Sequence, residues 1–329
     1  MANILVGDIG GTKTTLAVVS PEQGPRDFRA GKTFPSAHFS SLEEIIEEFL
    51  AGTDLAIDRA VFGIAGPVRD GWVRTTNLSW HVEEARLAEA FGWSSVCFMN
   101  DLEAMAAGVL HLDQSDLFVL NAGSALQEGA LAVIAPGTGL GEAFLVWDGT
   151  RYRAHASEGG HADFAPKSLL ERDLLTYLTA QFGHVSYERV CSGPGIWHIY
   201  GYLKRSGYGE EPAWLSQELS NTEDMTPVIV NAALDEERPC ELCARALDQF
   251  VSILGAEAGN LALKVLATGG VYVGGGIAPR IIPFLEKKIF MKSFRDKGRY
   301  TELMEKIPVH VILNPDVALS GAAARALRI

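Results

Sequence analysis

The feature that most constrains the fold is a rhythm of strands and helices that runs twice along the chain. Each run opens with two β-rich segments joined by a glycine-rich turn, and buried strands and helical patterns follow. Alternation of this kind is typical of a mostly parallel sheet with helices on its faces. Because the rhythm restarts near residue 111, the sequence predicts two α/β lobes.

The predicted elements follow this rhythm. In the first run the strands are residues 3–8, 14–19, 59–66 and 95–100, and the helices are residues 41–52 and 81–92. In the second run the strands are residues 116–121, 129–135, 141–147, 270–276 and 308–313, with a long helical stretch at about 167–267 and a last helix at 317–328. No linker rich in proline or serine separates the two lobes.

Composition and charge exclude several classes of protein. The 329 residues are 47% hydrophobic and 21% charged, which is the mixture of an ordinary folded protein. The net charge of −13 argues against nucleic acid or an anionic membrane as a partner. A bound anion such as a nucleotide would need local N–H groups, helix N-termini or a metal ion. Four scattered cysteines, with no leader-like or membrane-spanning run, favour the cytoplasm.

Three glycine-rich segments offer backbone that could cradle a nucleotide. The first is DIGGTKT at residues 8–14, whose glycines let the backbone approach a phosphate and whose Asp8 offers a carboxylate to magnesium or its waters. It is not a Walker A loop, because Thr12 stands where the second glycine should be. The other two are PGTGLG at 136–141 and VGGGIAPR at 273–280. For each segment alone, an ordinary turn is the alternative interpretation.

Two further motifs carry polar side chains. Asn100 and Asp101 directly follow a predicted strand, where an aspartate is either a helix N-cap or a general base. In ASEGGHADFAP, residues 156–166, Glu158 and His161 flank two glycines. Acid and imidazole groups suit a polyhydroxylated ligand, because each hydroxyl both donates and accepts hydrogen bonds. Metal binding by His161 is the competing interpretation, which no HExxH motif or nearby pair of cysteines or histidines supports.

Taken in order, the three glycine-rich segments resemble the phosphate-1, phosphate-2 and adenosine segments of the hexokinase, actin and Hsp70 superfamily. FGIAGPV, TTNLSW, MNDLEAMAAG, SEGGHADFAP and GHVSYERVCSGPG extend the match from about residue 4 to residue 328, and the chain resembles bacterial glucokinases of the non-ROK type. The resemblance implies a two-lobed, actin-like ATPase fold of the ribonuclease H-like kind, with a ligand cleft between the lobes. It also implies a homodimer. Within each chain, it implies a small lobe of residues 1–110 plus the C-terminal helix at about 314–329, and a large lobe of residues 111–313.

The resemblance further assigns site residues. It makes Asp101 the catalytic base on the 6-hydroxyl of glucose. The implied glucose ligands are Asn100, Asp101, Glu158, His161 and Glu188. The implied ATP contacts are Asp8, Ile9, Gly10, Gly11, Thr12, Lys13, Gly137, Thr138, Gly139, Gly275 and Gly276, with Mg²⁺ carried by ATP and approached by Asp8 through water. Zinc is not expected, because the stretch after His161 is ADFAPKSLL and lacks the cysteine cluster of the related ROK kinases.

The expected activity is transfer of the γ-phosphoryl of MgATP to glucose, giving glucose 6-phosphate and ADP for glycolysis. Phosphoryl transfer passes through a loose transition state, so the protein mainly aligns the reacting groups and neutralises charge. Two alternatives are open: a kinase for mannose, fructose or an N-acetylated sugar, and a sugar-sensing or ATP-binding regulatory protein that has lost the chemistry. Turnover on a panel of hexoses separates these possibilities.

Overall fold

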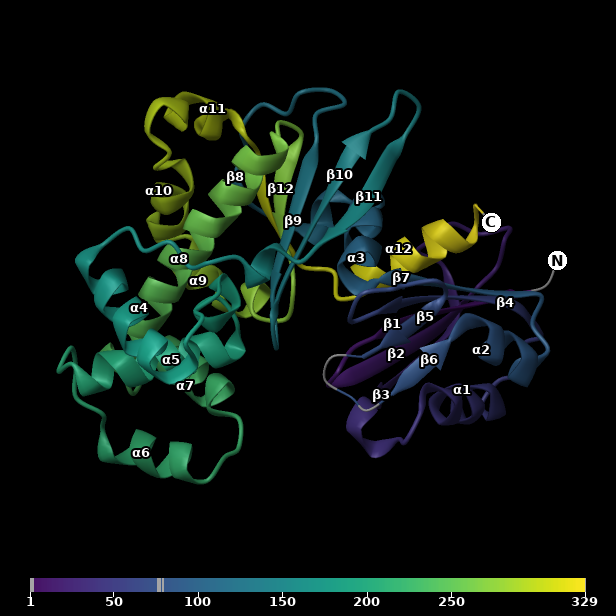
Figure 1. The fold of residues 1–329 in the computed structure, drawn as a ribbon, viewed down its shortest axis with the longest axis horizontal. Helices are drawn as coiled ribbons and strands as arrows, with labels where there is room; N and C mark the ends of the chain where they lie inside the picture. The colour runs from purple at the N-terminus through teal and green to yellow at the C-terminus, as the bar shows by residue number, and fades with distance from the viewer. Residues whose placement is uncertain (1–2, 76–77, 79, 329) are drawn as a thin grey trace. The chain divides into compact units, whose positions relative to one another are not determined.

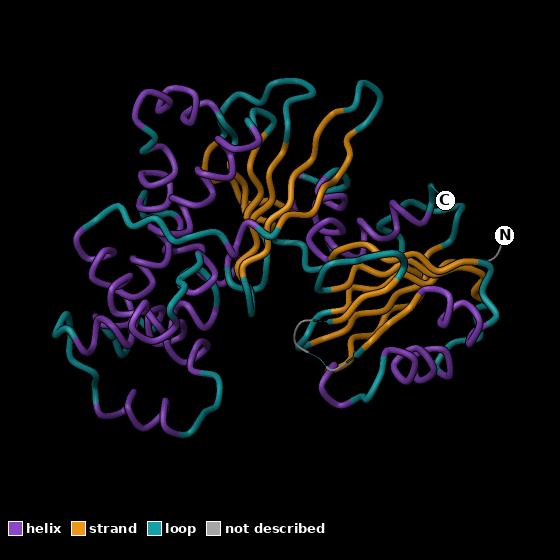
Figure 2. The backbone as a smooth tube through the Cα atoms, viewed as in Figure 1, coloured by secondary structure: helices purple, strands orange, loops and turns teal. Residues whose placement is uncertain are grey.

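The computed structural model describes residues 3–75, 78 and 80–328 and divides them into two compact units (Figure 1). Unit 1 comprises Met1–Asp116, Ala143–Ala156 and Asn314–Ile329, and unit 2 comprises Leu117–Glu142 and Ser157–Leu313. Three residues of the TTNLSW motif, Thr76, Asn77 and Ser79, lie outside the described residues. Each unit contains a β-sheet with helices packed on it, as the tube in Figure 2 shows.

Unit 1 contains a five-stranded sheet in the order β3-β2-β1-β4-β7. Its elements are β1 (Asn3–Ile9), β2 (Lys13–Val19), β3 (Phe28–Pro35), α1 (Leu42–Ala51), β4 (Ile57–Ile64), β5 (Trp72–Arg74), β6 (His81–Glu83), α2 (Glu84–Phe91), β7 (Ser95–Asn100), α3 (Asp101–Val109) and α12 (Val317–Ala326). β1–β2 and β2–β3 are antiparallel, whereas β1–β4 and β4–β7 are parallel. The sheet is therefore mixed rather than mostly parallel, because the connections among the first three strands are too short for parallel crossovers.

Alternate side chains of these strands are buried on opposite faces of the sheet. One face, which includes Leu5 and Leu16, packs against α1 and α2. The other face, which includes Val6 and Val61, packs against α3 and α12. Because α3 follows β7 directly, this packing fixes the position of its first residue, Asp101.

The predicted helix at 81–92 is shorter in the structure. His81–Glu83 forms β6, which pairs antiparallel with β5, and α2 starts only at Glu84. The apolar residue within this three-residue strand, Val82, also fits the helical spacing, so the sequence pattern alone does not separate the two states. The predicted end is confirmed, because Gly92 caps α2 with a φ of 65°.

Unit 2 contains most of a six-stranded sheet in the order β11-β10-β9-β12-β13-β8. The strands of this sheet are β8 (Leu117–Asn121), β9 (Leu131–Pro136), β10 (Leu140–Trp147), β11 (Tyr152–Ser157), β12 (Gly270–Val273) and β13 (Val309–Ile312). The helices of unit 2 are α4 (Leu169–Phe182), α5 (Gly193–Arg205), α6 (Ala213–Ser220), α7 (Met225–Leu234), α8 (Glu241–Val265), α9 (Ile282–Leu285), α10 (Ile289–Arg295) and α11 (Thr301–Lys306). The predicted helical stretch at 167–267 thus consists of five separate helices, α4 to α8.

The 25-residue helix α8 is the central helix in the core of unit 2 and packs against α5, α7 and α10. At Gly255 a Cβ atom would lie 2.3 Å from the carbonyl oxygen of Phe290, so α8 and α10 approach each other through backbone. Cys240 and Cys243, at the start of α8, are buried free thiols. Their CxxC spacing therefore reflects core packing on a helix.

The units depart from the predicted lobes at two places, residues 111–116 and residues 143–156, which both belong to unit 1. In the second of these segments, the far ends of β10 and β11, Phe144 stacks on His155 with ring centroids 5.3 Å apart. The same segment lines one pocket together with Glu103 of α3 and Arg325 of α12. Because both strands continue into unit 2, no break in the sequence marks this boundary.

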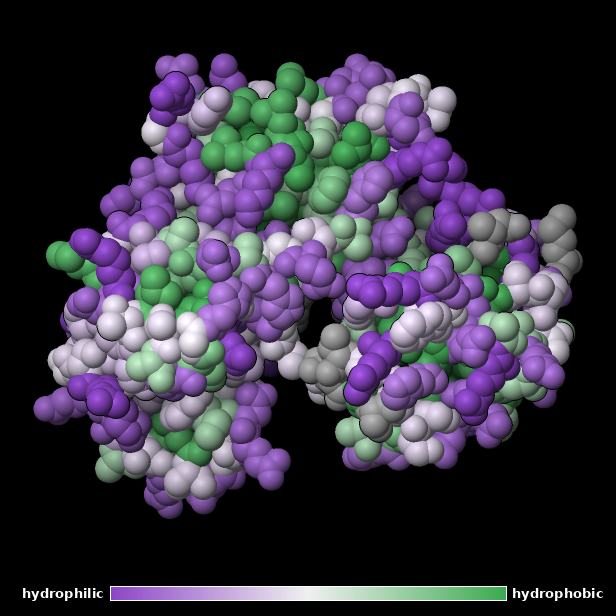
Figure 3. Space-filling view, viewed as in Figure 1, coloured by the Kyte–Doolittle hydropathy of each residue, from purple (hydrophilic) through white to green (hydrophobic). Residues whose placement is uncertain are grey.

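The surface of unit 2 includes apolar groups near the edge of its sheet. Figure 3 shows a mostly hydrophilic face with a green area in the region of β8 and β12. Val119 of the edge strand β8 is 53% exposed. Apolar groups at a sheet edge offer a surface that another chain could cover. None of the helices described here is long and apolar enough to span a membrane.

Candidate active site

The predicted site residues are divided between the two units. Unit 1 carries Asp8, Ile9, Gly10, Gly11, Thr12, Lys13, Asn100 and Asp101. Unit 2 carries Gly137, Thr138, Gly139, Glu158, His161, Glu188, Gly275 and Gly276. The structure defines the geometry within each half.

The predicted phosphate-1 segment is the turn between β1 and β2. The N–H of Gly10 donates to the carbonyl of Lys13 at 3.0 Å. Ser36, which is buried, fixes the turn from the neighbouring loop: its Oγ donates to the carbonyl of Gly10 at 2.8 Å, and its N–H donates to the carbonyl of Thr12 at 3.1 Å. Thr12 and Lys13 remain exposed. Sequence reasoning missed Ser36, since a single serine in a loop gives no signal.

Asp8 lies partly buried in β1, opposite Thr15 of β2. Burial and the nearby carboxylates of Asp101 and Asp316 raise the pKa of Asp8 to about 6, while Lys13 acts in the opposite direction. Asp316 directly precedes α12 and was not predicted, because no motif marks it. Three carboxyl groups near one ammonium leave an excess of negative charge at this end of β1.

Replacing Asp8 with asparagine should stabilise the ligand-free protein above about pH 6. The folded pKa of Asp8 exceeds the unfolded value of 3.8, so ionisation is penalised in the folded state, and the penalty is complete above the folded pKa. We expect urea unfolding at neutral pH to give D8N a free energy of unfolding higher by up to about 3 kcal/mol, reduced because Asp8 is partly exposed. The difference should shrink as the pH falls below 6. Equal stabilities at neutral pH would contradict the inferred repulsion.

Asn100 and Asp101 lie at the junction of β7 and α3. Asn100 is the N-cap: its Oδ1 accepts hydrogen bonds from the N–H groups of Leu102 and Glu103 at 3.0 and 3.3 Å. Its Nδ2 donates to the carbonyl of Gly66 at 3.2 Å. Asp101 is the first residue of α3, and its Oδ1 accepts from the N–H of Leu102 at 2.9 Å. The capping position is therefore occupied by Asn100, not by Asp101.

In unit 2 the second and third glycine-rich segments lie side by side. They follow β9 and β12, which are parallel neighbours in the sheet. The N–H of Gly274 donates to the carbonyl of Ile134 at 2.8 Å. Gly275 has a φ of 78°, and a Cβ atom there would lie 2.3 Å from the carbonyl oxygen of Pro136. Only glycine permits this approach, whereas a Cβ atom at Gly276 would meet open space.

The turn in PGTGLG is also held by the start of α5. The N–H of Gly137 donates to the carbonyl of Gly139 at 2.8 Å, and the carbonyl of Gly137 accepts from the N–H of Gly193 at 2.8 Å. Gly193 is the first residue of α5, which Ser192 caps. The N-terminus of α5 is thus part of the site, although sequence reasoning assigned it no role. The CSGPG segment, with a serine before a glycine and a proline, carried the signal of a helix start.

The two segments that carry the predicted sugar ligands of unit 2 meet at Leu140, the first residue of β10. Glu188 accepts a hydrogen bond from the N–H of Leu140 at its Oε2, at 3.1 Å. Glu158 and His161 lie at the two ends of the short 3₁₀ turn η3 (Gly159–His161), and the N–H of His161 donates to the carbonyl of Glu158 at 3.0 Å. Within this turn, a Cβ atom on Gly160 would lie 2.1 Å from the carbonyl oxygen of Leu140. The segment that contains Glu188 and the turn from Glu158 to His161 therefore both contact the backbone of Leu140.

Comparison with known proteins identifies the family. The profile of the glucokinase family, described as "Glucokinase", matches residues 5–329. The chain belongs to this family. It is 43% identical to a glucokinase of Synechocystis sp., over 98% of this chain and 97% of that one.

Solved glucokinase structures share the fold. A glucokinase from an Antarctic psychrotroph aligns with a TM-score of 0.81 at 34% identity, over 100% of both chains. A glucokinase from Balamuthia mandrillaris, solved in complex with glucose, aligns with a TM-score of 0.82 at 23% identity, over 98% of this chain and 93% of that one. The expectation of an ATP-dependent hexose kinase with a mixed α/β sugar-kinase fold is confirmed.

Proposed function

We propose that this chain transfers the γ-phosphoryl of MgATP to the 6-hydroxyl of D-glucose, giving glucose 6-phosphate and ADP for glycolysis. The observation that carries the proposal is the nearness of Asp101 to Asp8, which places a carboxylate at the start of α3 close to the predicted phosphate-1 turn. Asp101 hydrogen-bonds the 6-hydroxyl and accepts its proton as the new bond to phosphorus forms. A base so placed between sugar and phosphate serves phosphoryl transfer to a hydroxyl.

Asn100, Glu158, His161 and Glu188 bind the remaining sugar hydroxyls in this proposal. The carboxylates accept hydrogen bonds from hydroxyls. The Nδ2 of Asn100 carries two hydrogens; one donates to the carbonyl of Gly66, and the other donates to the sugar. The contact of both unit 2 segments with Leu140 supports a common ligand. Because the sugar would take ligands from both units, we propose that it binds in a cleft between two lobes of an actin-like fold, and that closure excludes water.

ATP is held by backbone in three places: residues 8–13, the turn at 137–139, and Gly275 with Gly276. In the turn, the N–H groups of Gly137 and Leu140 already donate, so we assign those of Thr138 and Gly139 to the phosphates. The described residues include no cluster of three or more histidine, cysteine, aspartate or glutamate side chains that could hold a metal. In our proposal Mg²⁺ arrives with ATP, where it neutralises phosphate charge, and Asp8 meets it through water.

Three narrower assignments complete the proposal. The chain belongs to the non-ROK branch, because the stretch ADFAPKSLL after His161 has no cysteine, and metal analysis should find no stoichiometric zinc. It forms a homodimer, for which the exposed Val119 on the edge strand β8 offers a surface, and light scattering of the native protein tests this. The few scattered cysteines support a cytoplasmic location, which cell fractionation tests.

The decisive experiment is the initial rate of ATP-dependent phosphorylation on glucose, mannose, fructose and N-acetylglucosamine, with a control that contains no sugar. We expect glucose to give the highest kcat/KM and the control to show little ATP hydrolysis, because the catalytic groups assemble only on the sugar. Preference for another hexose would replace the proposed substrate. Glucose binding without turnover on any sugar would support the regulatory alternative.

A further inference from the structure

Two buried glutamates of unit 2 have no role in the mechanism above. Glu142, the third residue of β10, is 1% exposed, and Glu257, in the middle of α8, is 0% exposed. A carboxylate is expensive to bury unless donors or an opposite charge compensate it. Two glutamates brought together in one core therefore call for an explanation from their hydrogen bonds.

The hydrogen bonds of Glu257 indicate which of the two side chains carries a proton. Glu257 accepts from Nδ2 of Asn260 at 2.8 Å and from Nζ of Lys264 at 3.2 Å. The carboxyl group of Glu142 lies close enough to that of Glu257 to interact with it, while its Oε1 has no hydrogen-bond partner among the residues that the structure describes. Two carboxyl groups can bond to each other only if one of them carries a proton. Because Glu257 already has a cationic donor, the proton belongs on Glu142.

The electrostatics of this pair agree with its geometry. Burial and the carboxyl group of Glu257 raise the pKa of Glu142 to about 8, while Lys264 acts in the opposite direction. Burial also raises the pKa values of the Tyr187 hydroxyl and the Cys191 thiol, both near Glu257, so these two groups stay protonated when Glu142 titrates. Lys297 is a further cation of this region, and burial lowers its pKa to about 8.

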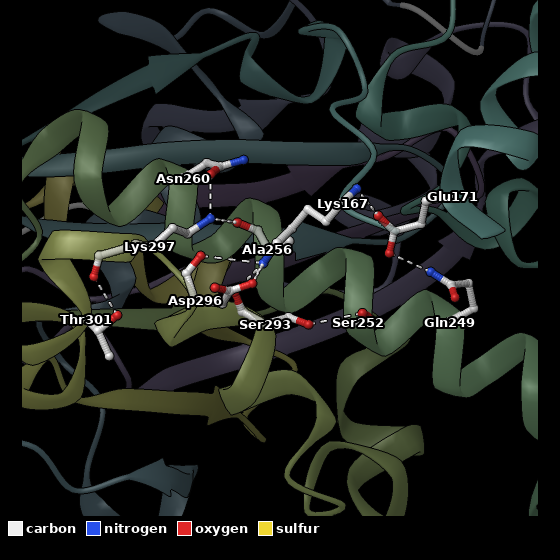
Figure 4. Close-up of polar contacts among 11 residues, drawn as sticks. Lys167, Glu171, Gln249, Ser252, Ala256, Asn260, Ser293, Asp296, Lys297 and Thr301 are labelled. Atoms are coloured by element: carbon white, nitrogen blue, oxygen red, sulfur yellow. Dashed lines mark hydrogen bonds and ion pairs between the residues drawn. The ribbon is translucent and has the colours of Figure 1, made fainter. Parts of the chain in front are cut away.

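A hydrogen-bonded network extends from this pair through Asn260. Its Oδ1 accepts from Nζ of Lys297 at 2.5 Å, and the same ammonium donates to the carbonyl of Ala256 at 2.8 Å (Figure 4). This bond fixes which way the amide of Asn260 faces, so that its Nδ2 donates to Glu257 and, at 3.0 Å, to the hydroxyl of Tyr187.

The two segments of unit 2 that carry the predicted sugar ligands both contact this network. A Cβ atom on Gly159 would lie 1.9 Å from Oε2 of Glu142, so the backbone between Glu158 and His161 lies directly against this carboxyl group. The other segment contains Tyr187 and its neighbour Glu188. The N–H of Tyr187 donates to the carbonyl of Ala162 at 2.9 Å, which joins the two segments.

We propose that Glu142 and Glu257 share one proton and act as positioning residues, which hold the Glu158–His161 turn and Glu188 in place for the sugar. The inference rests on the proposed function. Loss of the shared proton leaves two carboxylates in contact, and their repulsion pushes Glu142 against the backbone of Gly159. Sugar binding then weakens. The predicted base Asp101 is in unit 1 and outside this network, so turnover at saturating sugar changes little.

The test compares the wild type with E142Q at a series of pH values on both sides of 8. An amide keeps the hydrogen-bond donor of the protonated glutamate but cannot ionise. For the wild type we expect the KM for glucose to be constant below the pKa and to rise about tenfold above it, with kcat nearly constant. For E142Q we expect a KM close to the low-pH wild-type value throughout. Calorimetric glucose binding should give the same pattern, and it requires no turnover.

Two variants separate this effect from others in the same pH range. K297R keeps a cation on Asn260 but removes a lysine that titrates near the same pH, and it should retain the wild-type rise in KM. E171Q alters another buried glutamate of unit 2, which is bonded to the N–H of Lys167 and the amide of Gln249 (Figure 4), and it should also match the wild type.

If the KM of E142Q for glucose rises above pH 8 as much as that of the wild type, the inference is overturned. It is also overturned if K297R abolishes the rise in KM. If E142Q fails to fold, the wild type still decides the matter, since a glucose Kd that stays constant through pH 8 contradicts the shared proton. If glucose neither binds nor reacts at any pH, it is the proposed function that has failed. The hexose panel shows this independently of any Glu142 variant.

Discussion

Replacing Asp101 with asparagine is expected to lower kcat by about 10² to 10⁴, while the Kd for glucose changes by less than about tenfold. Asparagine has nearly the same shape, and its Oδ1 can still accept the hydrogen bond from the N–H of Leu102 at the start of α3. It cannot accept the proton of the 6-hydroxyl, so the loss falls on turnover rather than on binding. Steady-state kinetics with saturating ATP and calorimetric glucose binding measure the two quantities separately.

A matched control for D101N is E103Q, which removes a carboxyl group two residues further along the same helix. Burial raises the pKa of Glu103, and its side chain lines the pocket between α3, α12 and the far end of the β10–β11 hairpin. We expect E103Q to retain turnover close to the wild type. Near-normal turnover of D101N would remove Asp101 as the base.

The elements that were predicted correctly are those whose signal is local. The turn between β1 and β2 is marked by β-rich segments on both sides of two glycines, and the antiparallel pair forms there with Asp8 opposite Thr15. The strand before Asn100 and the helix after it are marked by a buried run followed by helical periodicity. In such segments, local preference and tertiary packing agree, and the sequence is sufficient.

The elements that were missed depend on contacts between distant parts of the chain. β3 is an edge strand with five exposed positions out of eight, so the apolar alternation of a buried strand is absent. Ser36 belongs to the site only because it bonds to the carbonyl of Gly10 from another loop. Asp316 reaches Asp8 only through the fold of α12 onto unit 1.

The pair of Glu142 and Glu257 shows the same limit for a buried group. Glu142 stands in an otherwise apolar strand, and Glu257 in an otherwise apolar stretch of α8. In isolation each resembles a polar interruption of a core pattern, and 115 positions separate the two in sequence (257 − 142). Only the fold brings the two carboxyl groups close to each other, so neither segment alone could indicate a shared role.

Replacing Gly108 with alanine is expected to lower the free energy of unfolding by about 3 kcal/mol and to reduce turnover with it. α3 and α12 pack backbone to backbone: a Cβ atom on Gly108 would lie 1.8 Å from the carbonyl oxygen of Val317, and one on Gly321 would lie 1.8 Å from that of Ala104. No rotamer change relieves a clash with backbone, so the two helices must move apart. Because α3 begins with Asp101, the same movement displaces the predicted base.

The control for G108A is G201A, at a helical glycine with room for a side chain. In the interior of α5, the nearest atom to a Cβ on Gly201 would be the hydroxyl of Tyr177, 3.9 Å away. Alanine should stabilise the protein there by about 0.5 to 1 kcal/mol, because it favours the helix over the unfolded chain. Urea unfolding measures both variants, and kcat is compared at saturating glucose and ATP. Equal stabilisation by both substitutions would show that α3 and α12 are not in backbone contact, and full activity of G108A would show that their packing does not position Asp101.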